Sequence, residues 1–125
     1  METEIATELE KANEALRRGD AREAIAMLRG LLIEASGDPA VAEVVHASLG
    51  DVYLTVRDIE RAEIHLREAV AISPDEAHYH YLLGFTYSIA ESWPSARNEL
   101  REAVRLLPEN AEYLRALGWA LHSGG

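Results

Sequence analysis

Cysteine is absent from the 125 residues, which excludes disulfides, zinc sites with thiolate ligands and cysteine nucleophiles. No apolar run approaches the ~18 residues that a membrane span needs. The first residues, "METEIATELEK", are acidic and amphipathic, unlike a secretory signal. These features predict a cytoplasmic protein without a membrane segment.

Basic residues are also scarce, because 12 lysines and arginines stand against 22 aspartates and glutamates, for a net charge of −10. Proteins that bind DNA or RNA present a basic stripe that neutralises phosphates, and the sequence shows no such stripe. It also lacks a nucleophile elbow, a phosphate-binding loop and an HExxH motif. We therefore expect a non-enzymatic protein without a cofactor and without nucleic acid as a partner.

The strongest positive feature is an internal repeat with a period of 34 residues. Residues 43–76, aligned without a gap on residues 77–110, are identical at 11 positions, and the pentapeptide "LREAV" occurs in both. A fixed period of this length is typical of stacked units of supersecondary structure.

Each repeat has the spacing of two helices joined by a short turn, since apolar residues recur at helical intervals in both halves. The turns are "TVRDIE" and "IAESWP", in which Asp58 and Ser92 are candidate N-caps. Pro74 and Pro108 are predicted to end the second helices, because proline clashes with the preceding turn. Each repeat is therefore predicted to be a helical hairpin.

Small residues are predicted to mark the closest approach of the two helices in each hairpin. Gly50 with Ala62, and Gly84 with Ala96, recur at equivalent positions. A glycine in an exposed helix would cost about 1 kcal/mol, so close packing is the better explanation for both glycines.

The motif H-x-x-L-G-x-x-Y … A-x-x-x-L-x-x-A … P at this spacing resembles the tetratricopeptide repeat family. His46 and His80 stand where that family often has tryptophan or another bulky residue, and Leu66 and Leu100 stand where it has an aromatic. The resemblance implies an all-α fold, a right-handed superhelical solenoid of helix-turn-helix repeats. It also implies that His46 and His80 fill a packing position rather than bind a metal.

The resemblance extends weakly to both ends of the chain. Ala12 takes the glycine position of a diverged first repeat, and "NAEYLRALGWALHSGG" repeats a leading helix once more. In that last helix Tyr113, Trp119 and Ala120 have no following hairpin to cover them. We expect one domain, 1–125, composed of repeats at about 5–38, 43–76 and 77–110, a linker at about 39–42 and a capping helix at 111–122.

The segment "HYHYLLGFTY" at 78–87 is apolar on more than one side. Its residues outside the repeat signature form a second stripe. The resemblance implies that this stripe of each leading helix lines a concave groove for a peptide or helix of a partner protein, one that carries an apolar segment. The predicted groove residues are Asn13, Arg17, Ser48, Asp51, Thr55, His78, Tyr81, Leu82, Phe85, Ile89, Arg115, Trp119 and His122.

Two further interpretations concern the partner. The family's clamp for acidic chaperone tails needs lysine, asparagine and arginine at five groove positions, which here hold Leu9, Asn13, Ser48, His78 and Leu82. Only the asparagine matches, so a clamp is not expected, because no cluster of cations would offset a buried carboxylate. The alternative function is self-association into a homo-oligomer through the aromatic stripe or the C-terminal helix.

Overall fold

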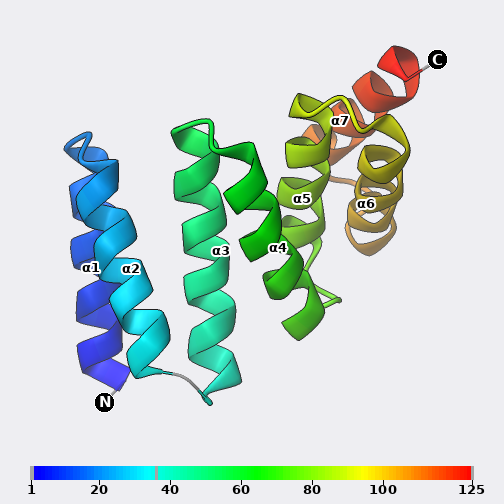
Figure 1. The fold of residues 1–125 in the computed structure, drawn as a ribbon. Coiled ribbons are helices and arrows are strands. Elements are labelled where there is room, and N and C mark those ends of the chain that lie inside the picture. The colour runs from blue at the N-terminus through cyan, green and yellow to red at the C-terminus, as the bar shows by residue number, and fades with distance from the viewer. Residues whose placement is uncertain (1, 36, 125) are drawn as a thin grey trace. The chain divides into compact units, whose positions relative to one another are not determined.

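The structure is a computed structural model that describes residues 2–35 and 37–124. Within these residues it contains seven helices and no strand (Figure 1). The helices are α1 (Glu2–Arg17), α2 (Ala21–Glu34), α3 (Pro39–Thr55), α4 (Ile59–Ile72), α5 (Ala77–Ile89), α6 (Trp93–Leu106) and α7 (Ala111–Ser123). The predicted all-α fold of helix-turn-helix repeats is confirmed.

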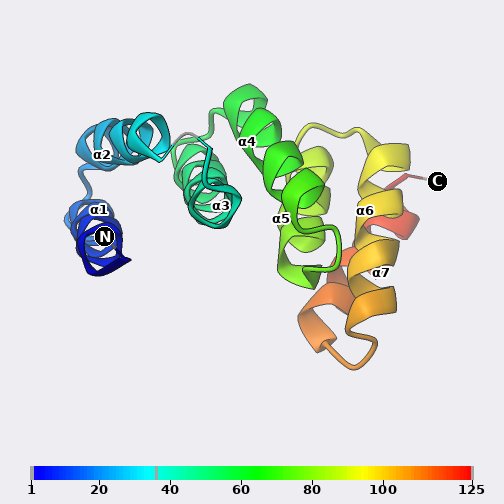
Figure 2. The same cartoon turned by 90° about the horizontal axis from the view of Figure 1, so that it is seen from below.

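The chain divides into two compact units, residues 1–65 and 66–125, with the boundary inside α4. In the first unit α2 packs against α1 and α3, and α3 also touches α1. In the second unit α6 packs against α5 and α7, and α5 also touches α7. Helices that follow one another in the chain are thus neighbours within each unit, as Figures 1 and 2 show.

The three hairpin turns share one backbone geometry. Each turn contains a residue with positive φ: Gly19 (84°), Arg57 (66°) and Glu91 (59°). The amide of the next residue donates to a carbonyl five residues back, as from Asp58 to Tyr53 at 2.9 Å, which is the Schellman motif. The left-handed conformation costs a non-glycine residue about 1 kcal/mol, so packing of the hairpins must hold the two later turns in place.

The two predicted N-caps behave differently. The side chain of Asp58 accepts a hydrogen bond from the Arg61 amide at 3.2 Å, as expected of a cap. Ser92 occupies the N-cap position of α6 but makes no side-chain capping bond. Pro94, in the first turn of α6, has no amide hydrogen to donate, which removes one of the usual partners of a capping hydroxyl.

The predicted linker at 39–42 is wrong, because these residues form the first turn of α3. Asp38 is the N-cap and accepts a hydrogen bond from the Ala40 amide at 3.1 Å. Pro39 follows at the first helical position, where its missing amide hydrogen costs nothing. The residues of the predicted linker therefore lengthen α3 to 17 residues, against 13 in α5.

The core of the second unit extends into α7. Tyr113 packs with Ala77 and Ala103, and Ala120 packs with Ala96 and Leu100. Tyr113 is 6% exposed and Ala120 is fully buried.

The expectation that Tyr113 and Ala120 lack a cover is therefore wrong. The face of α7 that bears them is turned back toward α5 and α6, as the contacts of α7 with both helices require. Of the three residues predicted to be uncovered, only Trp119 remains half exposed.

Candidate functional site

Helix α5 carries the predicted aromatic stripe. Glu76 caps the helix by accepting a hydrogen bond from the His78 amide at 3.4 Å. We name the α5 stripe by its members: His78, Tyr81, Leu82, Phe85 and Ile89. His78 is exposed and Phe85 is 37% exposed, whereas the other three are half-buried.

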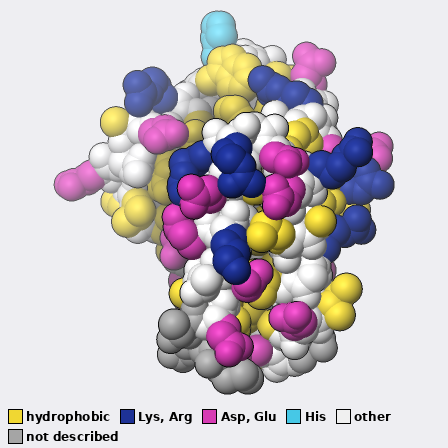
Figure 3. All heavy atoms as spheres, turned by 90° about the vertical axis from the view of Figure 1, so that its left-hand side faces the viewer, with side chains coloured by type: hydrophobic (Ala, Val, Ile, Leu, Met, Phe, Trp, Pro, Cys, Tyr) yellow, Lys and Arg dark blue, Asp and Glu magenta, His cyan; other side chains and the backbone are white. Residues whose placement is uncertain are grey.

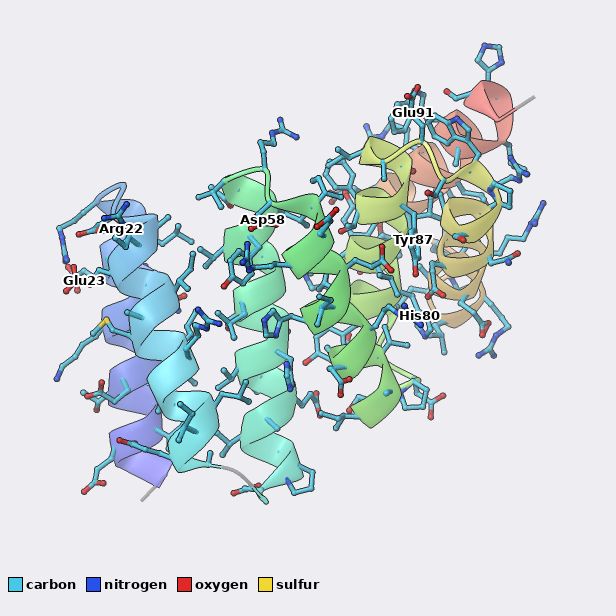
Figure 4. The ribbon with its side chains drawn as sticks, in the orientation of Figure 1. Arg22, Glu23, Asp58, His80, Tyr87 and Glu91 are labelled. Carbon is cyan, nitrogen blue, oxygen red and sulfur yellow. The ribbon has the colours of Figure 1, made fainter. Side chains whose placement is uncertain are left out.

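The signature face of α5 is buried against the neighbouring helix. His80 and Leu83 are buried, and His80 and Tyr87 lie between α5 and α6 in Figure 4. His80 Nε2 donates to the Pro74 carbonyl at 2.7 Å, and Nδ1 lies 2.8 Å from Glu99 Oε1. His80 therefore fills a buried position with an oxygen within hydrogen-bonding distance of each ring nitrogen, the packing role that the repeat signature predicts for it.

Gly84 makes the tightest contact on this face. A Cβ atom placed on Gly84 would lie 2.7 Å from Leu100 Cγ and 2.9 Å from Leu100 Cδ2. The predicted close approach is thus present, but the side chain that requires the glycine is Leu100 rather than Ala96. Leu100 is fully buried, so it has little room to retreat.

Tyr81 is the best anchored residue of the α5 stripe. Its ring stacks on Tyr113 with centroids 4.9 Å apart, and its hydroxyl donates to Glu112 Oε1 at 2.7 Å. Partial burial, together with this carboxylate, raises the pKa of Tyr81 to about 12. Tyr81 is therefore held in one orientation by α7 and is partly a packing residue.

Phe85 and His78 extend the aromatic row from Tyr81 in both directions. The Tyr81 ring centroid lies 6.2 Å from that of Phe85 and 6.1 Å from that of His78. Spacings of this size are typical of interacting aromatic rings. The row therefore offers a partner a partly exposed surface that is already ordered.

Trp119 pairs with a residue that the sequence did not single out. Its indole makes an edge-to-face contact with Trp93, at the start of α6, with centroids 5.3 Å apart. Trp119 is 50% exposed, and Arg115 and His122, its predicted companions on α7, are exposed too. In the second unit, the ring contacts among the described residues thus form two groups, one around Tyr81 and one made of the two tryptophans.

The predicted groove residues of the first unit lie on α1 and α3. Asn13, Arg17, Asp51 and Thr55 are exposed, and Ser48 is half-buried. Arg17 pairs with Glu10 at 3.0 Å, and the Thr55 hydroxyl donates to the Asp51 carbonyl at 3.0 Å. The grouping of these residues with the α5 stripe in one groove stays a prediction.

Sequence reasoning missed Trp93, Glu112 and the contact role of Tyr113. The repeat register held a partial signal, since Glu112 follows His78 and Tyr113 follows Tyr79 by one period of 34 residues. Nothing in the register indicates that Tyr81 reaches across to both, because that contact joins side chains 31 and 32 positions apart.

Neither a cluster of three metal ligands nor a membrane-spanning helix occurs in the described part of the chain. Over residues 2–35 and 37–124, no group of three or more His, Asp or Glu side chains is placed to hold a metal ion. None of the described helices is both long enough and apolar enough to cross a bilayer.

Comparison with known proteins identifies the family. A model of the tetratricopeptide repeat family matches residues 9–77 and 90–125. No curated protein sequence matches the chain significantly.

Solved structures share the fold at low identity. The first TPR domain of Spaghetti (RPAP3), bound to an HSP90 peptide, is 19% identical with a TM-score of 0.84, covering 95% of this chain and 91% of that one. The second TPR domain of human RPAP3, in complex with an HSP70 peptide, is 15% identical with a TM-score of 0.84 and coverages of 96% and 97%. MamA is 20% identical with a TM-score of 0.82 and coverages of 94% and 67%.

Domains of this kind are non-enzymatic and mediate interactions between proteins. The match to the family model spans most of the chain, and the helical hairpins, the buried signature faces and the glycine at the close approach agree with it. The chain belongs to the tetratricopeptide repeat family.

Proposed function

We propose that this chain is a cytoplasmic scaffold or co-chaperone-like module that binds a peptide or helix of a partner protein in its concave groove, with the α5 stripe at the centre. One observation carries the proposal: α5 buries its signature face while presenting a row of partly exposed aromatics on the other side. A partly exposed apolar patch that is already ordered is typical of an interaction site. The remaining predicted groove residues on α1, α3 and α7 would supply polar contacts.

The exposed area of the aromatic side chains limits how much binding free energy apolar contacts can supply. Each partly exposed aromatic can give up on the order of 50–100 Å², which at about 25 cal/mol per Å² is worth roughly 1–2.5 kcal/mol. Association costs on the order of 4–15 kcal/mol. The partner must therefore combine an apolar segment with polar contacts, and we expect an exchangeable complex.

Acidic chaperone tails are not the ligands that we propose. Two of the similar structures hold HSP90 or HSP70 peptides, and the HSP90 peptide is SRMEEVD. Here the five clamp positions hold Leu9, Asn13, Ser48, His78 and Leu82, in a chain of net charge −10. SRMEEVD is therefore a useful negative probe, because its carboxylates would meet no cationic cluster.

Peptide titration with matched variants tests the proposal. A panel of labelled peptides with apolar segments is titrated against the chain and against Phe85→Ala, with folding checked by circular dichroism. We expect Phe85→Ala to weaken binding about tenfold, as for a central aromatic contact. Leu107→Ala is the control, since Leu107 is 49% exposed and lies outside the predicted groove.

Two outcomes would contradict this function. Equal affinity of Phe85→Ala and the parent chain would remove the α5 stripe from the binding surface. Loss of folding in Phe85→Ala would show that the ring belongs to the core. Tyr81→Ala is a poorer probe, because Tyr81 also packs against Tyr113.

A second candidate is self-association through α7. Leu114 is 46% exposed and Leu121 is 42% exposed, and a Cβ atom on Gly118 would have nothing within 4 Å. These three residues share one face of α7. Sedimentation equilibrium tests the idea: a mass that rises with concentration and returns to the monomer value in Leu121→Glu would support it, and a constant monomer mass would exclude it.

A further inference from the structure

The first unit contains a hollow that is distinct from the predicted groove. It has a volume of about 770 Å³ and is lined by the first half of α1, by α2 from Ala26 onward and by the connection to α3. None of the predicted groove residues lines it. Its size falls within the range of known ligand sites, about 300–1,000 Å³.

The wall of the hollow is apolar and adaptable. Ile5 and Met27 are half-buried there, and Leu31 is buried. Methionine adjusts its shape readily to different partners.

Gly30 also lines the hollow, and a Cβ atom on it would meet nothing within 4 Å. A helical glycine costs about 1 kcal/mol relative to alanine. No contact within the described chain explains it, in contrast to Gly84. A ligand that approaches α2 closely at this point would explain the missing side chain.

Every charged residue that lines the hollow is acidic: Glu4, Glu8, Glu34 and Asp38. Glu8 pairs with Lys11 at 3.3 Å, and Asp38 caps α3. Among the described residues, Glu4 and Glu34 have no ion-pair partner. Figure 3 views the molecule from the side of α1 and α2. Near the lower end of this surface it shows acidic side chains and no lysine or arginine.

We propose that this hollow docks a basic amphipathic helix of a partner protein. The apolar face of that helix would lie on Ile5 and Met27, and its lysines or arginines would pair with Glu4 and Glu34. A helix suits the site because both α1 and α2 line the hollow, and a groove between helices is a common receptor for an amphipathic helix. The carboxylates exclude a nucleic acid or an anionic membrane surface by repulsion.

The first test compares shape variants. The probe is a labelled synthetic amphipathic helix with leucines on one face and lysines on the other, and its counterpart carries glutamates in place of the lysines. Gly30→Leu places a large side chain in the hollow, starting from a Cβ position with nothing within 4 Å, and Gly30→Ala adds only a methyl group at the same place. We expect Gly30→Leu to weaken binding of the lysine peptide at least about tenfold, and Gly30→Ala to weaken it by a smaller factor, because a methyl group takes up less of the hollow.

The second test compares charge variants of equal net charge. Glu4→Lys with Glu34→Lys alters the rim, whereas Glu14→Lys with Glu60→Lys alters exposed carboxylates outside the lining. We expect only the rim pair to weaken binding about tenfold. Phe85→Ala is expected to leave the affinity of this peptide unchanged, which separates this site from the α5 stripe.

Three results would overturn the proposal. The glutamate peptide could bind as tightly as the lysine peptide, or the two charge pairs could weaken binding equally, which would reduce the effect to net charge. Gly30→Leu could also dissolve a homodimer of the parent chain, and the hollow would then belong to a second copy.

Discussion

Helices α5 and α7 carry the same repeat signature, but their signature residues lie in different surroundings. In α5 the signature positions His80, Leu83 and Gly84 are all buried. In α7 the equivalent positions hold Leu114, half exposed, Leu117, half-buried, and Gly118, exposed. The signature residues therefore form a face on which a second helix can pack. They contribute strongly to stability only where such a helix is present.

The largest expected contrast between α5 and α7 comes from leucine truncation. Leu83→Ala removes a side chain that is 3% exposed and leaves a cavity, so we expect a loss of about 2–4 kcal/mol in the free energy of unfolding. Leu114→Ala on α7 removes a half-exposed side chain and should change it by less than about 0.5 kcal/mol. Urea denaturation of both variants measures the difference, and similar losses would mean that the α7 face is covered in solution.

Gly84 and Gly118 extend the comparison of α5 with α7. Substitution by alanine should change the free energy of unfolding in opposite directions at the two positions. Gly84→Ala pushes a methyl group onto Leu100, and we expect a loss of about 1–3 kcal/mol. Gly118→Ala enters open space and should gain about 0.5–1 kcal/mol from helix propensity. Thermal unfolding monitored by circular dichroism distinguishes the signs. A gain in both variants would show that α5 and α6 are less closely packed than the structure has them.

The smallest expected effect concerns Tyr81 and its counterpart Arg115, one period later on α7. Tyr81→Phe deletes the hydrogen bond to Glu112 and should cost about 0.5–1.5 kcal/mol. Arg115→Ala alters an exposed side chain and should change the free energy of unfolding by less than about 0.5 kcal/mol.

The pH dependence provides a separate check on Tyr81. Its pKa rises in the folded state from an ordinary value of about 10 to about 12. The stability from the neutral hydroxyl is therefore fully present below pH ~10 and is lost as the pH rises toward ~12. Tyr81→Phe should lack this part of the alkaline loss in denaturation curves recorded across that range. An unchanged alkaline profile would exclude the Tyr81 hydroxyl as its source.

Much of the hairpin architecture could be predicted because its signals are local. Apolar spacing, Asp58 and the prolines after α4 and α6 act within a few residues of their own positions. The linker prediction at 39–42 was wrong because the repeat register does not include the local helix-start signal of Asp38 followed by Pro39. The alignment of the repeats identifies equivalent positions, but the first residue of each helix depends on the N-cap residue before it.

The candidate site was less accessible from the sequence. Repeat position indicated which face of α5 would be covered, and the buried signature residues agree with that assignment. Repeat position did not indicate that Tyr81 would stack on Tyr113 of α7, or that Trp93 would lie against Trp119. Those contacts depend on side chains that meet only after the helices have packed.

The helices, their pairing into hairpins and the family follow from the amino-acid sequence, because helical periodicity and a fixed repeat period can be read along the chain. Which of two equivalent residues is indispensable depends on the tertiary structure: Gly84 faces Leu100, whereas Gly118, at the same repeat position, faces open space. The physical reason is that the room beside a residue is set by atoms from elsewhere in the chain. Identical letters at equivalent positions can therefore differ in energy and in availability to a partner.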